Sequence, residues 1–230
     1  MPKYSIEGND FQHLRITLEP GERIYVDGGH LISKDSSVAM RTVMQGGFLS
    51  ALKRTLTGST FFVTELEGPG EAVLAGVFPG KVFEIDLNGN SVLAESHSFL
   101  AAEEGVNYDA KMVGIGAGIL AGEGLFFARF SGRGKLFLHA YGGLVARELR
   151  PNERIQVEAG HLLAFDEGMR YSVSTVGGIR SMLFSHEGWF FVSLEGPGRA
   201  YLHTVTAQQL AYVIEPFLPR QGGGGIQINF

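Results

Sequence analysis

The chain has 230 residues, of which 44% are hydrophobic, and it carries a net charge of −5 when the histidines are neutral. This apolar content excludes an intrinsically disordered protein, and the acidic balance argues against a general nucleic-acid binder. The absence of cysteine makes disulfides, thiolate nucleophiles and cysteine-ligated metals impossible. The start of the sequence lacks the features of a signal peptide, and no apolar run reaches about 18 residues, so we expect a cytoplasmic protein without a transmembrane segment.

The first predicted strands are residues 14–18 and 23–27, which contain alternating apolar residues and are separated by a Pro-Gly turn. The same phrase returns 131 residues later: the segments 18–35 and 149–166 share ten of eighteen residues. A weaker copy follows the strand predicted at 83–87. Such self-similarity at a regular period indicates an internal triplication.

Each repeat ends in a glycine-rich turn between two apolar strands. The spacing is 64 residues from Gly68 to Gly132 and again 64 residues to Gly196. In the first copy, the proline presets its own φ to about −65°, and the glycine after it adopts the positive φ that the turn requires. The strand before this turn is expected to point Leu66 toward the core and Glu65 toward solvent. The structural turn residues are Gly68, Pro69, Gly70, Gly132, Gly134, Gly196, Pro197 and Gly198.

The whole pattern predicts a mainly β chain with few short helices, at residues 48–56 and 207–214. We expect a single domain of residues 1–220, built from three β-sandwich or double-stranded β-helix-like units in a pseudo-threefold array, and a flexible glycine-rich tail at 221–230. The three units lie near residues 14–82, 83–144 and 145–214.

Four histidines occupy equivalent repeat positions, His30 with His161 and His139 with His203. Under threefold symmetry, equivalent histidines converge on an axis and can bind a metal. However, the third partners are a serine and an alanine, and no acidic residue lies at ligand spacing beside any of the four. The pattern therefore favours structural histidines over metal or small-molecule ligands.

The glycine-rich segment 113–122 has the wrong spacing for a phosphate-binding loop, because a G-x-G-x-x-G motif would place glycine where Ile119 stands. Such backbone loses much conformational entropy on ordering and persists when it is packed against a partner. We therefore expect a subunit contact through Ile115, Ile119 and Leu120, with shallow insertion into a membrane surface as the alternative.

The L-x-P-G/N-E-R-I-x-V phrase, the G-H-L phrase and the L-E-G-P-G turns together resemble the altered-inheritance-of-mitochondria family, from about Tyr4 to Leu218. The resemblance implies a fold similar to that of the tryptophan RNA-binding attenuation protein, a homo-oligomer and, in the mitochondrial branch, a role in inner-membrane organisation. The family has no established catalytic residues, so the resemblance implies no activity and no cofactor. The RNA and tryptophan sites of the attenuation protein have no matching motif here.

The leading functional hypothesis is a non-enzymatic scaffold or interaction protein that acts as a homo-oligomer and contacts membranes, if at all, only peripherally. The alternative is a small-molecule or metal-binding module that uses the four histidines. A third hypothesis, nucleic-acid binding, rests on the basic residues Arg129, Arg133 and Lys135 beside aromatic residues. Glutamates at the matching positions of the other two turns would repel phosphates, so we expect no nucleic-acid partner.

Overall fold

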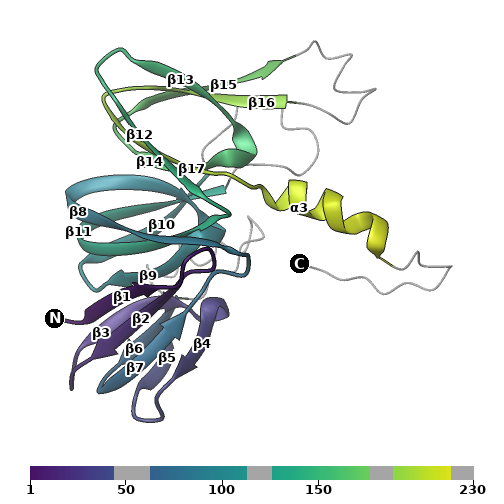
Figure 1. The fold of residues 1–230 in the computed structure, drawn as a ribbon. Coiled ribbons are helices and arrows are strands. Elements are labelled where there is room, and N and C mark those ends of the chain that lie inside the picture. Colours follow the sequence, from purple (N-terminus) through teal and green to yellow (C-terminus); the bar gives the residue numbers. More distant parts are fainter. Residues whose placement is uncertain (44–62, 113–125, 177–188, 219–230) are drawn as a thin grey trace.

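The structure is a computed structural model that describes residues 1–43, 63–112, 126–176 and 189–218. Its strands form three successive blocks, each with a hydrophobic core (Figure 1). The chain is therefore mainly β, as the sequence predicts. The helix predicted at 48–56, the contact residues Ile115, Ile119 and Leu120, and the tail 221–230 lie outside the described residues.

The first block lies at the bottom of Figure 1. Its elements are β1 (Lys3–Glu7), β2 (His13–Leu18), β3 (Arg23–Asp27), the short 3-10 helix η1 (Gly28–His30), β4 (Leu31–Lys34), β5 (Ala39–Val43), β6 (Val63–Glu67) and β7 (Gly70–Leu74). The second block follows in the middle, with β8 (Gly80–Glu95), η2 (Ser96–Ser98), β9 (Phe99–Glu103), β10 (Val106–Met112) and β11 (Phe126–Tyr141).

The third block lies at the top of Figure 1. It consists of β12 (Leu144–Leu149), β13 (Arg154–Glu158), η3 (Ala159–His161), β14 (Leu162–Asp166), β15 (Arg170–Val176), β16 (Trp189–Glu195) and β17 (Gly198–His203). The same order of strands around a 3-10 helix recurs in each block, with the long β8 and β11 each taking the place of two shorter strands. A pseudo-threefold array of the blocks remains a prediction.

A ten-stranded sheet runs through all three blocks, and two further sheets of four and three strands face it. The blocks join where β9 of the second block pairs with β3 of the first, and where β14 of the third pairs with β8 of the second. Both pairings are antiparallel, and both joining strands also pair with a strand of their own block, β11 and β17. Each joining strand is therefore bonded along both edges.

The two joining strands each contribute side chains to two cores. In β9, Phe99 and Ala102 belong to the core of the second block, whereas Leu100 and Ala101 belong to that of the first. In β14, the residues equivalent to Phe99 and Ala102 are Leu162 and Phe165, which belong to the core of the third block. The residues equivalent to Leu100 and Ala101 are Leu163 and Ala164, which belong to the core of the second block. The cores of the first and second blocks are thus each closed by a leucine and an alanine of the block that follows.

The glycine-rich turns have the backbone that the sequence predicts: Gly70, Gly134 and Gly198 adopt φ values of 138°, 139° and 152°. The Gly68–Pro69 and Gly196–Pro197 peptide bonds are cis. An acidic side chain stabilises each turn by accepting a hydrogen bond from the backbone N–H that follows the glycine. These 2.9 Å bonds run from Glu71 to Asp35, from Lys135 to Glu103 and from Arg199 to Asp166.

One orientation predicted near the first turn is wrong. Leu66 is fully buried as expected, but Glu65, which we expected in solvent, is only 8% exposed. The reason is that β6 lies between β3 and β5, with Tyr25 and Arg41 directly opposite Glu65 on the two sides. Flanking side chains on the same face of a sheet cover a central residue, and strand alternation alone does not reveal this.

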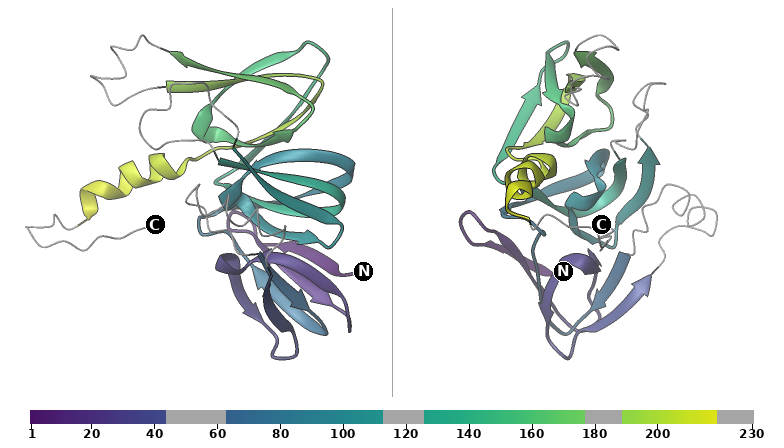
Figure 2. Two further views of the ribbon diagram at one scale, coloured as in Figure 1. Left: turned by 180° about the vertical axis from the view of Figure 1, so that it is seen from behind. Right: turned by 90° about the vertical axis from the view of Figure 1, so that its right-hand side faces the viewer.

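The helix predicted at 207–214 is confirmed as α3 (Ala207–Ile214), followed by η4 (Glu215–Phe217). Thr206 and Gln209 form a capping box at its start: the threonine hydroxyl accepts from the Gln209 N–H, and the glutamine side chain accepts from the Thr206 N–H, both at 3.0 Å. The helix projects away from the strands in Figure 1 and in the left view of Figure 2, and none of its residues is buried.

Candidate functional site

Three of the four predicted histidines, His30, His139 and His203, lie where successive blocks meet. His30, in η1 of the first block, donates from Nδ1 to the carbonyl oxygen of Phe99, on β9 of the second block, at 2.9 Å. The same nitrogen lies 3.4 Å from a carboxylate oxygen of Asp27, three residues earlier. His161 has an equivalent neighbour in Glu158, at 4.0 Å. The expectation that no acidic residue accompanies these histidines is therefore wrong, because the 3-10 helix brings residues i and i+3 together.

His203 connects the third block to the second. Its Nδ1 accepts a 3.0 Å hydrogen bond from the Tyr141 N–H, which places the ring proton on Nε2. That nitrogen lies 3.3 Å from Oε2 of Glu95, at the end of β8. The imidazole also stacks on the Tyr141 ring, with 4.9 Å between centroids. The contact therefore holds a neutral histidine between a backbone amide and a carboxylate.

His139 is the most deeply buried of the four, with 1% of its surface exposed, and its Nδ1 has no hydrogen-bond partner in the described part of the chain. The pKa of this histidine falls to about 4, mainly because of burial and in smaller part because of the nearby His30 and His203. The ring packs directly on Gly76, where an added Cβ would lie 2.1 Å from Nδ1. His139 is therefore a neutral, tightly enclosed group at neutral pH.

His161 ties the C-terminal helix to the third block. Its Nδ1 donates to the carbonyl oxygen of His203 at 2.9 Å, and its Nε2 accepts from the side-chain amide of Gln209 at 3.2 Å. Both ring nitrogens are thus occupied by groups of the chain itself.

The structure groups the histidines differently from the repeat pattern. His139 lies within electrostatic range of its equivalent His203 and also of the non-equivalent His30, and His161 bonds to the backbone of His203. Within residues 1–43, 63–112, 126–176 and 189–218, no group of three or more histidine and acidic residues is arranged to hold a metal ion. Their use as ligands stays an untested prediction, whereas the hydrogen bonds of His30 and His203 join neighbouring blocks.

Sequence reasoning missed two residues at the contact between the second and third blocks, Glu95 and Tyr141. Glu95 occupies the repeat position of Asp27 and Glu158, immediately before the 3-10 helix, so the repeat carried a signal for it. Nothing in the sequence indicates that the backbone amide of Tyr141 selects the tautomer of His203.

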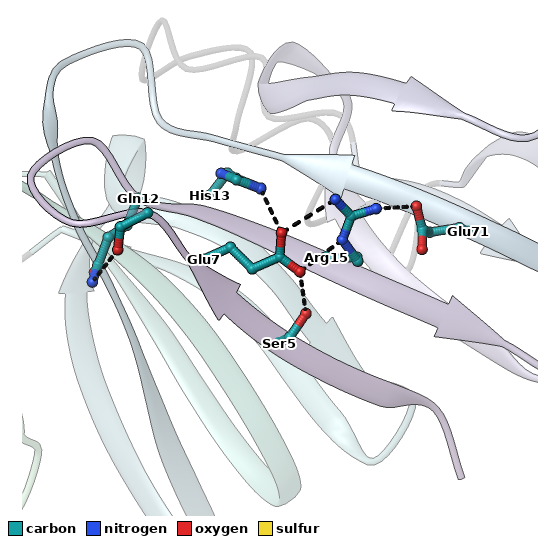
Figure 3. Close-up of polar contacts among 7 residues, drawn as sticks. Ser5, Glu7, Gln12, His13, Arg15 and Glu71 are labelled. Atoms are coloured by element: carbon teal, nitrogen blue, oxygen red, sulfur yellow. Dashed lines mark hydrogen bonds and ion pairs between the residues drawn. The ribbon is translucent and has the colours of Figure 1, made fainter.

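A second polar group ties the N-terminal strand to the outer face of the first block (Figure 3). Glu7 on β1 accepts hydrogen bonds from Arg15 at 2.8 Å and from Ser5 at 2.9 Å, and lies 3.2 Å from the His13 ring. Arg15 also pairs with Glu71 on β7. The hydrogen bond from Arg15 is the main reason that the pKa of Glu7 falls to about 2. These groups link β1, β2 and β7 through solvent-accessible ion pairs.

The third block contains an open groove of about 650 Å³ between β12 and β13. Val145 and Arg147 from β12 line one side, and Ile155 and Val157 from β13 line the other. Leu202 from β17 also contributes an apolar surface. The groove is lined further by Gln156, Glu158, His161, His203 and Thr204.

Comparison with known proteins agrees with this architecture. Residues 4–205 match the protein family described as Mitochondrial biogenesis AIM24. The chain belongs to the AIM24 family. The resemblance predicted from the repeat phrases and the turns is thereby confirmed, and the family description links AIM24 proteins to mitochondrial biogenesis.

A crystal structure shares the fold of this AIM24 chain: protein SPYM3_0169 from Streptococcus pyogenes, with a TM-score of 0.77 and 21% sequence identity. The alignment covers 95% of the AIM24 chain and 100% of the streptococcal one. A comparison with curated proteins finds no match. In the described ranges of this AIM24 chain, no helix is both long enough and apolar enough to cross a bilayer.

Proposed function

We propose that this AIM24-family protein is a non-catalytic scaffold or interaction protein that acts as a homo-oligomer and is linked to membrane organisation. In this proposal, the three blocks form a pseudo-threefold array that serves as a rigid frame, and the function resides in the surfaces that the frame presents.

The observation that carries the proposal is the apolar surface at the C-terminal end of the described chain. Tyr212, Val213 and Ile214 on α3 are exposed, as are Phe217 and Leu218 just after it, with Phe217 exposed to 83%. The first three lie on α3, which projects from the frame (Figure 2), and the other two follow within four residues of its end. Contiguous exposed apolar surface is typical of sites that bind another protein or a membrane.

The state of the histidines supports a frame rather than a ligand site. His30 and His203 bond to backbone groups of a neighbouring block, and His161 bonds to His203 and to α3. Replacing such bonds with bonds to a ligand would leave backbone groups unpaired. One observation favours the second candidate function, a metal or small-molecule module: Nδ1 of His139 and Oε2 of Glu95 are buried without hydrogen-bond partners.

Sedimentation equilibrium of the full chain tests the oligomer. The proposal predicts a mass that is a multiple of 24.9 kDa at tens of micromolar protein, and a monomer under these conditions contradicts it. Metal analysis of untagged protein tests the second candidate, which requires stoichiometric metal that disappears in a His139→Leu variant.

Cosedimentation with phospholipid vesicles tests the membrane link. Since α3 contains no basic residue, we expect binding to neutral phosphatidylcholine vesicles as well as to anionic ones. The double variant Tyr212→Ser, Phe217→Ser should lose binding, while Val77→Ser, an equally exposed apolar position on the frame, should retain it. Equal binding by all three proteins would contradict a role for α3 in membrane contact.

A further inference from the structure

The two internal junctions of the chain leave one half-junction open at each end of the molecule. Among the described residues, no strand takes beside β13 the place that β9 takes beside β3, and none takes beside β4 the place that β8 takes beside β14. Within this part of the chain, β13 pairs with β16 alone, and β4 pairs with β7 alone. By contrast, their counterparts β3, β8, β9 and β14 are all paired along both edges.

Burial along β4 shows the consequence of the missing neighbour. All of Phe99–Ala102 on β9 and all of Leu162–Phe165 on β14 are buried. On β4, the residues that correspond to the outward pair Leu100 and Ala101 are Ile32 and Ser33, and both are exposed, Ile32 to 62%. Ile32 is thus apolar like Leu100, which packs against the preceding block, but no described residue of a preceding block covers it.

The complementary surface is the groove between β12 and β13. At the internal junctions, Leu100 packs in a core with Leu14 and Ile16 of β2, and Leu163 packs with Phe83 and Ile85 of β8. The corresponding positions on β12 are Val145 and Arg147, which line the groove, and Val145 is 42% exposed. The chain therefore carries an unfilled groove at one end and an exposed isoleucine at the other.

The two ends cannot meet within one molecule as it stands, because β4 lies at the bottom and β13 at the top in Figure 1 and in both views of Figure 2. We propose that β4 of one copy pairs antiparallel with β13 of a second copy, so that Ile32 fills the groove and the four-stranded sheet of one copy joins the three-stranded sheet of the next. This inference rests on the proposed homo-oligomer and specifies its contact.

The internal junctions also give the register. At the first, Ile24, Tyr25 and Val26 lie opposite Glu103, Ala102 and Ala101. At the second, Val92, Leu93 and Ala94 lie opposite Asp166, Phe165 and Ala164. The same register places Asp35, Lys34 and Ser33 of one copy opposite Ile155, Gln156 and Val157 of the next. Because the two surfaces differ, the contact is head-to-tail, which gives a closed ring or a filament rather than a twofold dimer.

Other free edges in the described chain do not share this character. β5, β10 and β15 hold equivalent places in the three blocks, and each is an unpaired edge in its own block. An edge that is free in every block is a property of the block itself, whereas β4 and β13 are free although their counterparts in the other described blocks are paired. This contrast supplies a matched control, since Met40 on β5 is an exposed apolar residue in the same block as Ile32.

Sedimentation and cross-linking of the full chain test the contact. Ile32→Asp should weaken self-association by at least about tenfold, because a carboxylate would be buried in the groove, while Met40→Asp should leave it unchanged. The native chain lacks cysteine, so two single variants, Lys34→Cys and Gln156→Cys, can be mixed and mildly oxidised. We expect a covalent pair of chains; Lys34→Cys mixed with Val157→Cys, displaced by one residue onto the opposite face, should yield much less.

The outcomes separate this inference from the function on which it rests. If the wild type assembles but Ile32→Asp assembles equally well, or Lys34→Cys and Gln156→Cys do not cross-link, the edge contact is wrong while the homo-oligomer stands. If the wild type is a monomer at tens of micromolar and no mixture cross-links, both are wrong. Circular dichroism should show Ile32→Asp to be folded, since Ile32 contributes little to the isolated chain's core.

Discussion

The first and third blocks contain equivalent strands, β2 and β12, whose inner faces meet different surroundings. Leu14 and Ile16 on β2 are fully buried, partly by Leu100 from the next block. The corresponding Val145 and Arg147 on β12 are exposed in the groove. The comparison teaches that a block of this fold does not complete its own core. The neighbouring block determines how far these side chains are buried. The charged residue Arg147 occupies the position for which the described residues provide no neighbouring block.

The largest effect is expected from filling the close backbone contact between β8 and β11 in the second block. A Cβ at Gly80, where β8 begins, would lie 1.8 Å from the carbonyl oxygen of Ala140. Because both atoms belong to packed backbone, Gly80→Ala should lower the free energy of unfolding by about 4 kcal/mol or prevent folding. Gly168→Ala, in an open turn of the third block with no atom within 4 Å of the new Cβ, is the control and should change it by less than about 0.5 kcal/mol. Urea denaturation measures the free energy of unfolding of both variants. Similar midpoints for the two would show that the contact between Gly80 and Ala140 is not tightly packed.

The second effect tests the comparison directly. Leu14→Ala removes a fully buried side chain and should cost about 3 kcal/mol. Val145→Ala, at the equivalent place in the third block, should cost less than about 1 kcal/mol in the monomer because the side chain is already exposed. Equal losses in urea denaturation at low protein concentration would mean that the two inner faces are covered alike.

The third prediction concerns the position that holds His139 in the second block and His203 in the third. The pKa of His139 is about 4 in the folded chain against an ordinary value of 6.5. The unfolded state therefore binds more protons between these values, so stability is complete above about pH 6.5 and falls as the pH drops toward 4. This group alone should remove about 2 kcal/mol of stability between pH 7 and pH 5.

The variant His139→Leu isolates this contribution. It should lose about 2 kcal/mol less than the wild type over the same pH interval, whatever its stability at pH 7. Glu95, His30, His203 and the backbone of Phe78 surround the ring and stay in place in the variant. Parallel pH profiles for the two proteins would refute a buried neutral histidine.

The smallest effect concerns α3, which the third block has and the first block lacks in the described residues. Thr206→Ala removes the capping hydroxyl and should destabilise the helix by about 1 kcal/mol. Thr206→Ser keeps the hydroxyl and serves as the control. Hydrogen exchange of the Gln209 amide, which donates to Thr206, should accelerate roughly fivefold in the alanine variant and little in the serine variant. Unchanged exchange in both would mean that another contact holds the helix start.

Local features of the fold were accessible from sequence because local chemistry decides them. The strand at Arg23–Asp27, the helix Ala207–Ile214 and the positive φ of Gly70 follow from alternation, capping residues and turn composition. The pairing of β9 with β3 was not accessible, since it joins residues about 75 positions apart and depends on which block follows which. Glu65 was misplaced for the same reason: strands distant in sequence cover it.

The candidate site was partly predictable. The repeat pointed to His30, His139, His161 and His203, and the structure places all four at or near the seams between blocks. Their partners could not be read from the sequence, because the Phe99 carbonyl and the Tyr141 amide are backbone groups with no sequence signature. The repeat pattern thus identifies which residues occupy equivalent positions. The contacts that these residues make depend on how the blocks pack against one another, which the repeat pattern does not show.

The long strand β11 has a consequence for synthesis of the chain on the ribosome. Its Phe137 belongs to the core of the first block and packs on Tyr4 near the N-terminus, with 4.7 Å between ring centroids. Residues 1–79 therefore leave the exit tunnel before the side chains that cover them exist. A nascent chain of this protein therefore exposes part of its first core until residue 137 has emerged. A released fragment of residues 1–79 should bind hydrophobic dyes that the complete chain does not.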